Sequence, residues 1–292
     1  MSTAAELQSG KGHRDENFPV ASLLIQRRHR PVILAFYRFA RAADDVADHP
    51  TASSAEKLTL LQEMDRTLTG ELDSAPEALA LRRILNEREL SAQHGLMLLE
   101  AFRRDVTKLR YENWEELMEY CRYSAMPVGR FVLDVHGESR DAWPANDALC
   151  AALQIINHLQ DCGNDYRALG RVYLPEDALA AAGVTVKDLR ADRASPGLRR
   201  VISDLARRTK KLLDEASPFA NRIRDARLSF EVTIIQHLAE DLARKLMYRD
   251  PLCERVHHRK ADLVPLLLRA TARFAQSRIA GDRRAPALRH SP

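Results

Sequence analysis

The chain has 292 residues, of which 45% are hydrophobic and 29% charged, and this mixture is typical of a folded globular protein rather than a disordered one. Its formal net charge is only +4, and no uninterrupted apolar run reaches the roughly 20 residues that a membrane-spanning helix needs. Glycine is scarce, and helix-forming residues such as Ala, Leu, Arg and Glu are abundant, which favours helix over sheet.

The first half of the chain carries apolar residues at helical spacing. Residues 1–16 are polar and lack periodicity, so we expect a flexible tail. A helical pattern from Val20 to Asp48 restarts at Pro31 and ends at His49, because the residue before a proline is pushed out of the helical region. Further helices are expected over residues 54–68, 77–87 and 91–109.

The second half continues the helical pattern. Asn113 with Glu116 three residues later forms a capping-box pattern, and the helix that it starts is expected to kink near Pro127. Asn146 or Asp147 is expected to cap the long helix that follows. The last helices are expected to start at Pro175 and to cover residues 197–220, 228–248 and 262–279. No alternating strand pattern and no internal repeat is present, so the sequence predicts one all-α domain of about ten helices.

An acidic motif ends the first strong helix. Asp44 and Asp48 are four residues apart, so their carboxylates lie on one helix face roughly 6 Å apart and repel each other. Either a bound cation or the nearby Arg38 and Arg41 must balance them. The motif alone therefore leaves two interpretations: a metal site, or a solvated helix end neutralised by arginines.

A second polar stripe runs along the expected long helix. Gln154, Asn157, Asp161 and Asp165 recur at helical spacing between apolar residues, and a polar stripe on a buried helix is costly unless it is paired or binds a metal. Oxygen-only ligands suit Mg²⁺, which combines one or two carboxylates with phosphate oxygens and water. The competing interpretation is an exposed polar face.

The two motifs together indicate a specific chemistry that neither motif indicates alone. Two oxygen-rich faces across a helical cavity would hold a diphosphate through bridging metal ions, which stabilise negative charge on that group as it leaves. A carbocation would remain, and an apolar, aromatic cavity would protect it from premature capture. The pair therefore predicts ionisation of a diphosphate substrate.

Three ordered blocks of sequence resemble the squalene/phytoene synthase family, over roughly residues 17–270. They are YRFARAADDVAD at 37–48, YCRYSAMPVG at 120–129, and LQIINHLQD at 153–161 followed by Asp165 and GRVYLP at 170–175. This resemblance implies an all-α isoprenoid-synthase bundle around a central cavity, with Mg²⁺ as cofactor and farnesyl or geranylgeranyl chemistry. The metal ligands that it implies are Asp44, Asp48, Asn157, Asp161 and Asp165. The substrate contacts that it implies are Tyr37, Arg41, Gln154, Asn157, Arg171 and Tyr173, with Tyr120 facing the reacting carbons and Tyr120 and the four aspartates in catalysis.

One departure from the family pattern bears on the substrate. Members that condense two diphosphates usually carry an arginine directly before the second-motif aspartate, whereas this chain has Gln160 there and His158 two residues earlier. Together with residues 16–22 (ENFPVAS), these positions resemble the bacterial hydroxysqualene synthase subgroup. The subgroup implies hopanoid-pathway chemistry, in which presqualene diphosphate is ionised, rearranges and is captured by water. His158 itself is expected to be a structural neighbour of Asn157 rotated about 100° from it, or else a participant in water delivery.

Two rival functions remain from the sequence. One keeps the fold and condenses two farnesyl diphosphates to presqualene diphosphate, squalene or dehydrosqualene. The other is a non-catalytic binding partner in a lipid pathway, against which the intact, mutually repelling carboxylates argue. Other squalene-pathway enzymes are candidate partners, and nucleic acid is not an expected one.

The C-terminal end is basic. From Arg259 to Pro292 eight Lys or Arg face two acids, so the region suits an anionic membrane surface or simply water. The segment 264–274 is expected to be a core helix rather than a membrane anchor. Four cysteines without CxxC spacing, and the lack of a secretory signal pattern, predict a cytoplasmic location with peripheral membrane contact as an option. The expected division is a tail over 1–16, a catalytic domain over 17–276 and a basic tail over 277–292.

Overall fold

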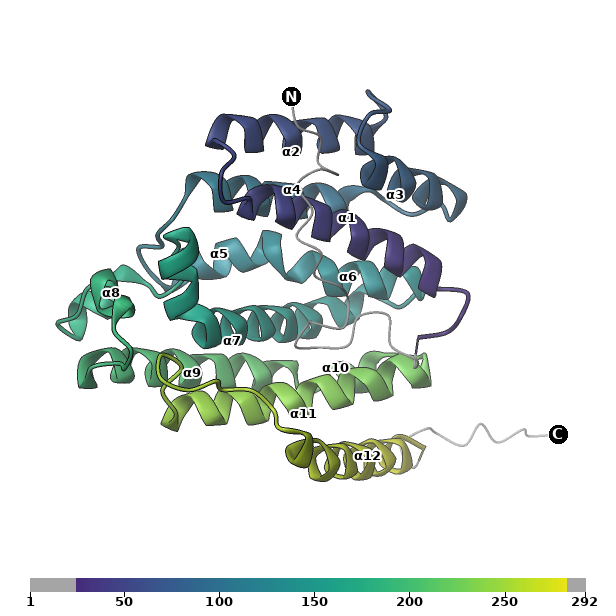
Figure 1. The fold of residues 1–292 in the computed structure, drawn as a ribbon. Helices are drawn as coiled ribbons and strands as arrows, with labels where there is room; N and C mark the ends of the chain where they lie inside the picture. The colour runs from purple at the N-terminus through teal and green to yellow at the C-terminus, as the bar shows by residue number, and fades with distance from the viewer. Residues whose placement is uncertain (1–24, 283–292) are drawn as a thin grey trace.

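A computed structural model describes residues 25–282, and all its regular secondary structure is helical within that range (Figure 1). The expected tail over 1–16, the block at 16–22 and most of the expected basic tail lie outside the described residues. The helix α1 (Arg30–Asp48) has Pro31 in its first turn and ends before Pro50, as the sequence predicts. The N–H groups in the first turn of a helix have no partner within the helix. Proline has no N–H, so it fits in the first turn without the loss of a hydrogen bond.

Three helices follow α1 and pack around it. They are α2 (Ser54–Thr69), α3 (Pro76–Glu87) and α4 (Gln93–Thr107). A reciprocal capping box between Ser53 and Glu56 starts α2, and Gly70 ends it with φ at 93°, a left-handed conformation that favours glycine. Buried side chains of these four helices form one core cluster, in which Phe36 of α1 stacks on Phe131 with ring centroids 3.9 Å apart.

The expected kink near Pro127 is a complete break between α5 (Trp114–Ser124) and α6 (Met126–Val135). Pro127 lies in the first turn of α6, so its missing N–H begins a new helix instead of bending the old one. The Asn113 side chain caps α5 by accepting from Glu116 N at 2.9 Å, as predicted. In a complete capping box the Glu116 carboxylate would accept from the backbone N–H of Asn113. Here it accepts from Glu112 N instead.

The central helix α7 (Trp143–Leu169) begins earlier than predicted. The expected caps at Asn146 and Asp147 are wrong, since both residues lie inside the helix. Asn146 is buried and donates to Met126 O at 3.4 Å, whereas Asp147 accepts from Arg130 Nε at 2.8 Å. These residues therefore fasten α7 to α6 instead of starting α7.

The last part of the chain covers the other side of α7. It comprises α8 (Glu176–Ala181), a short 3-10 helix at Val186–Arg190, α9 (Pro196–Ala216), α10 (Phe219–Arg222), α11 (Ala226–Tyr248) and α12 (Lys260–Asp282). Another short 3-10 helix, Arg140–Ala142, directly precedes α7. The single helix expected over 197–220 is thus divided into α9 and α10. Figure 1 shows α7 between the α1–α6 layers and the α9–α11 layer, with α12 outermost. A second core cluster gathers buried side chains from α5 through α11.

The outer helix α12 differs from the expected core helix over 264–274. Leu266 and Ala270 are buried, whereas Val264 and Leu268 are 62% and 67% exposed. Proline inside the helix, at position 265, removes one N–H donor there. The helix therefore packs one face against α11 and presents apolar side chains on the other. No helix in the described part of the chain has the length and apolarity to cross a bilayer.

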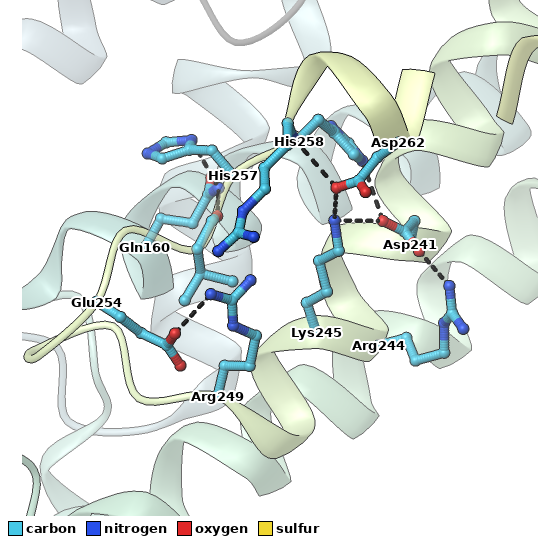
Figure 2. Close-up of polar contacts among 11 residues, drawn as sticks. Gln160, Asp241, Arg244, Lys245, Arg249, Glu254, His257, His258 and Asp262 are labelled. Carbon is cyan, nitrogen blue, oxygen red and sulfur yellow. Dashed lines mark hydrogen bonds and ion pairs between the residues drawn. The ribbon is translucent and has the colours of Figure 1, made fainter. Parts of the chain in front are cut away.

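Polar contacts attach the connection between α11 and α12 to the rest of the bundle (Figure 2). Lys245 on α11 contacts Asp241 at 3.0 Å and Asp262 on α12 at 2.7 Å, which joins the two helices. Gln160 on α7 donates to the backbone oxygen of Val256 and to His257 Nδ1, the latter at 3.1 Å. Gln160 is 6% exposed and Val256 only 1%, so these bonds lie inside the protein.

Replacing Gln160 by leucine is expected to lower the free energy of unfolding by about 2 kcal/mol, because the buried Val256 oxygen loses its donor. For a chain of this size the melting temperature should fall by about 5 °C. The same change at Gln62, an exposed residue of α2, is the control. Equal melting temperatures for the two variants in thermal unfolding would contradict this role of Gln160.

Candidate active site

A cavity of about 300 Å³ opens between the two core clusters. Its wall includes residues of α1, α4, α5 and α7, and of the segment that follows α7. Nine of the eleven predicted site residues line it: Asp44, Asp48, Tyr120, Gln154, Asn157, Asp161, Asp165, Arg171 and Tyr173. Tyr37 and Arg41 do not. Residues separated by more than one hundred positions thus meet at one site.

The two acidic faces meet across this cavity. Burial and the charge of Asp48 raise the pKa of Asp44 to about 7. Burial and the neighbouring Asp161 likewise raise the pKa of Asp165 to about 7. Both shifts have the same meaning: the cavity holds more negative charge than its surroundings stabilise, and a divalent cation would relieve it.

The donor set fits a magnesium site that is shared with a ligand. All its candidate ligands are carboxylate or amide oxygens, which Mg²⁺ prefers. Among residues 25–282 no group of three His, Cys, Asp or Glu side chains is close enough to hold a metal ion alone. Mg²⁺ usually keeps several waters and phosphate oxygens, so one or two carboxylates from each face leave positions for a diphosphate.

Arg41 lies beside the first acidic face, outside the cavity wall. Its guanidinium contacts Asp44 Oδ2 at 2.9 Å and Asp45 Oδ1 at 2.7 Å. The predicted balance of the motif by a nearby arginine is therefore present for Asp44. Asp48 forms its ion pair with Arg171. Arginines therefore pair with both carboxylates of the motif, Arg41 with Asp44 and Arg171 with Asp48.

Asp105 on α4 is a cavity residue that the sequence did not reveal. It is 6% exposed and accepts hydrogen bonds from the hydroxyls of Tyr120 and Tyr173, both at 2.8 Å. Burial raises the pKa of Asp105 to about 6, although Arg171 and the two hydroxyls oppose the rise. Burial also raises the pKa of both tyrosines, so both remain neutral donors.

One signal for Asp105 was present in the sequence. It continues a row of buried residues on α4, Leu98 and Ala101, at the spacing of a single helix face. An acid at a core-facing position needs a partner. The partners themselves come from α5 and from the segment after α7, and helical spacing could not predict that meeting.

Arg171 joins the first acidic face to Asp105. It is 7% exposed, donates from Nε to the backbone oxygen of Asp105 at 2.9 Å and from Nη2 to Ala47 O at 3.0 Å, and forms an ion pair with Asp48. The carboxylates of Asp105 and Asp48 raise its pKa further above its usual value. The cavity therefore has one fixed positive charge on its wall beside the carboxylates.

His158 also lines the cavity, so its rotation of about 100° from Asn157 does not remove it from the site. Its ring stacks on Tyr173 with centroids 3.5 Å apart, and the Gln154 amide nitrogen lies 3.0 Å from His158 Nε2. Burial and Arg171 lower the pKa of His158 to about 3, so the imidazole is neutral. Gln160, by contrast, points away from the cavity toward Val256.

Comparison with known proteins identifies the family of this chain. The sequence model of the squalene/phytoene synthase family matches residues 12–262. The chain belongs to the squalene/phytoene synthase family. It is 57% identical over 271 residues to a hydroxysqualene synthase of Zymomonas mobilis, covering 92% of this chain and 91% of the relative. It is 56% identical to a hydroxysqualene synthase of Rhodopseudomonas palustris, covering 90% of each chain.

Solved structures agree on the fold of this family member. The squalene synthase HpnC from Alicyclobacillus acidocaldarius is 35% identical, with a TM-score of 0.70 over 83% of this chain and 91% of that one. A dehydrosqualene synthase has a TM-score of 0.73 at 22% identity, over 94% of this chain and 96% of the other, which shows the fold alone. The predicted family, the all-α fold and the assignment as an enzyme are confirmed. Enzymes of this family process prenyl diphosphates and generally depend on divalent metal ions.

The middle sequence block, at residues 120–129, has a structural reason for its glycine. A Cβ on Gly129 would lie 1.9 Å from Asn146 Oδ1 and 2.7 Å from Cys150 Sγ. Only glycine lets α6 approach α7 this closely. Because α7 carries the second acidic face and α5 carries Tyr120, the block fixes how these two parts of the cavity wall meet.

Proposed function

We propose that this enzyme is a hydroxysqualene synthase, which ionises presqualene diphosphate with Mg²⁺ and lets water capture the rearranged carbocation. The observation that carries the proposal is the meeting of two carboxylate faces, from α1 and α7, on one cavity with an aromatic wall. Three relatives that share 50–57% identity with this chain are hydroxysqualene synthases, and they support the choice of substrate.

The proposed metal ligands are the polar residues of the two faces, whose oxygens fit Mg²⁺: Asp44, Asp48, Asn157, Asp161 and Asp165. When bound, Mg²⁺ supplies positive charge that stabilises the departing diphosphate. Arg171 adds a fixed positive charge on the same wall and orients the diphosphate. Arg41 pairs with Asp44 of the first face. By family position, Arg41 and Tyr37 are proposed to contact the diphosphate end of the substrate.

The proposed carbocation site is the aromatic wall next to Asp105. Tyr120 and Tyr173 have ring centroids 5.4 Å apart, and Tyr111 stacks behind Tyr173 at 5.6 Å. Aromatic faces attract cations without reacting with them. Since both hydroxyls of Tyr120 and Tyr173 donate to Asp105, the rings are held in place and their oxygens are oriented toward that carboxylate.

Substrate choice is tested by offering presqualene diphosphate and farnesyl diphosphate separately to purified protein, with Mg²⁺ and without a nicotinamide cofactor. Hydroxysqualene should form from presqualene diphosphate, and farnesyl diphosphate should be left unchanged. Release of presqualene diphosphate or squalene from farnesyl diphosphate would favour condensation instead. Binding of either compound without any turnover would favour a non-catalytic partner.

The proposed organisation is a catalytic domain over 17–276 between tails over 1–16 and 277–292, in a cytoplasmic protein that touches the membrane surface. Within the described residues α12 suits that contact. Val264, Leu267 and Leu268 are exposed large apolar residues on this one helix, and Arg269 beside them is exposed as well. Apolar side chains next to cations are typical of helices that bind anionic membrane surfaces.

Exchanging Val264, Leu267 and Leu268 for serine is expected to reduce co-sedimentation with phosphatidylglycerol vesicles at least about fivefold, because the apolar contact area is lost. Vesicles of phosphatidylcholine should bind the parent protein weakly. The control carries serine at Leu109 and Val128, which are exposed apolar residues elsewhere. A protein truncated to 1–276 measures the basic tail separately. Equal binding by the triple-serine variant and the control would contradict the role of α12.

A further inference from the structure

His158 is held in the cavity from two sides. Its ring lies nearly parallel to Tyr173, at 13° and 3.5 Å between centroids, and Tyr120 is 5.9 Å away. The Gln154 amide nitrogen lies 3.0 Å from His158 Nε2, and the histidine is 8% exposed. His158 belongs to neither acidic face nor to the hydrogen bonds of Asp105. Neither of those two groups therefore explains why His158 is held at this position in the cavity.

Most other polar groups near the aromatic wall are already engaged. The hydroxyls of Tyr120 and Tyr173 donate to Asp105, and Arg171 donates to Asp48. Gln154 donates its amide nitrogen to His158, so its amide oxygen is the atom of this side chain that can accept a hydrogen bond from a molecule in the cavity.

Ser124 adds a second polar atom on the same cavity wall. Its Oγ is buried and has no hydrogen-bond partner among the described residues. A buried hydroxyl without a partner is energetically costly, so a polar molecule that enters the cavity would be stabilised by a hydrogen bond to it. The wall next to the aromatic rings thus offers hydrogen-bonding groups that the protein itself does not use.

We infer that His158 and Gln154 together position the water molecule that captures the carbocation, and so direct the product toward an alcohol. This inference rests on the proposed function. A lone pair of the water oxygen forms the new C–O bond to the cationic carbon, and one O–H bond of that water then breaks. The proton passes to an oxygen of the released diphosphate, so no oxidant or reductant is needed. His158 acts by holding Gln154, whose amide oxygen accepts from the water.

The carbocation has a second possible fate, and for this reason His158 and Gln154 would affect which product forms. A carbocation in a cavity of rings and carboxylates can lose a proton to give an unsaturated hydrocarbon. Water competes only if it is held close to the cationic carbon, because a correctly oriented neighbour reacts as if it were present at very high concentration. Removing the positioning groups should therefore change the product more than the rate of ionisation.

The test compares His158→Leu, Gln154→Leu and the parent protein with presqualene diphosphate and Mg²⁺, measuring released diphosphate and the organic products by mass spectrometry. In the His158→Leu variant diphosphate release should stay within about fivefold of the parent, and for both variants each product is expressed as a share of the total organic product. The hydroxysqualene share should fall about tenfold as hydrocarbons formed by proton loss replace it. His158→Gln, which can still bond Gln154, should restore most of the alcohol.

The matched control is His237→Leu, because His237 also lies on a helix and bonds a carbonyl of its own helix at Thr233, away from this cavity. Its products should equal those of the parent. An unchanged hydroxysqualene share in both leucine variants would overturn the inference, and so would loss of diphosphate release without any hydrocarbon. If the parent itself releases no diphosphate from presqualene diphosphate, the proposed function fails first.

Discussion

Asparagine in place of Asp44 or Asp161 is expected to lower turnover of presqualene diphosphate by about 1000-fold, because each change removes one carboxylate from a proposed metal-binding face. The fold should be unaffected. Asp44 and Asp48 repel each other in the metal-free protein, and burial raises the pKa of Asp44 to about 7. Removing one charge therefore reduces the repulsion between the carboxylates. Circular dichroism should show unchanged helicity and an equal or higher melting temperature.

Asp65→Asn is the matched control for this pair. Asp65 is a partly buried carboxylate on α2 that pairs with Arg103 at 2.7 Å and lies outside the cavity. Its variant should turn over substrate at the parent rate. Undiminished turnover in both the Asp44 and the Asp161 variants would remove the argument for a metal clamp between α1 and α7.

Leucine in place of Asp105 is expected to lower the free energy of unfolding by about 4 kcal/mol. Two buried tyrosine hydroxyls lose their acceptor, and the buried Arg171 loses a neighbouring charge. Thermal unfolding should show a melting temperature about 10 °C lower. Asp105→Asn keeps the volume and one acceptor oxygen, so it should fold well while turnover falls by about 100-fold through misplacement of Tyr120.

Asp214→Leu controls for the loss of an ion-paired aspartate on the surface, since Asp214 is exposed and bonds Lys210 at 2.8 Å. Such a surface change should alter the free energy of unfolding by no more than about 0.5 kcal/mol. An Asp105→Leu protein as stable as the Asp214 variant would show that the hydrogen bonds at Asp105 contribute little. An Asp105→Asn protein with parental turnover would separate Asp105 from catalysis.

Local chemistry made much of the fold predictable from the sequence. Pro31 and Asn113 mark helix starts in the structure as they did in the sequence. The stripe from Gln154 to Asp165 lines one cavity because helical spacing alone puts those residues on one face. These features depend only on neighbours within a turn or two of helix.

Features that depend on contacts between distant segments were not predictable. Asp105 obtains its partners from α5 and from the segment after α7, and Gln160 turns toward Val256 because the α11–α12 connection packs there. Arg41 lies behind Asp44 rather than on the cavity wall. In each case the side chain itself suggested a polar role, whereas its partner was set by how the helices pack.

The proposed reaction is ionisation of presqualene diphosphate in this cavity, followed by capture of the cation by water. It is tested most directly by incubating the purified protein with presqualene diphosphate and Mg²⁺ in ¹⁸O-labelled water, without a nicotinamide cofactor, and analysing the product by mass spectrometry. We expect hydroxysqualene carrying one ¹⁸O atom, one equivalent of released diphosphate, and no product when the metal is chelated. Unchanged substrate, or a hydrocarbon as the sole product, would contradict it.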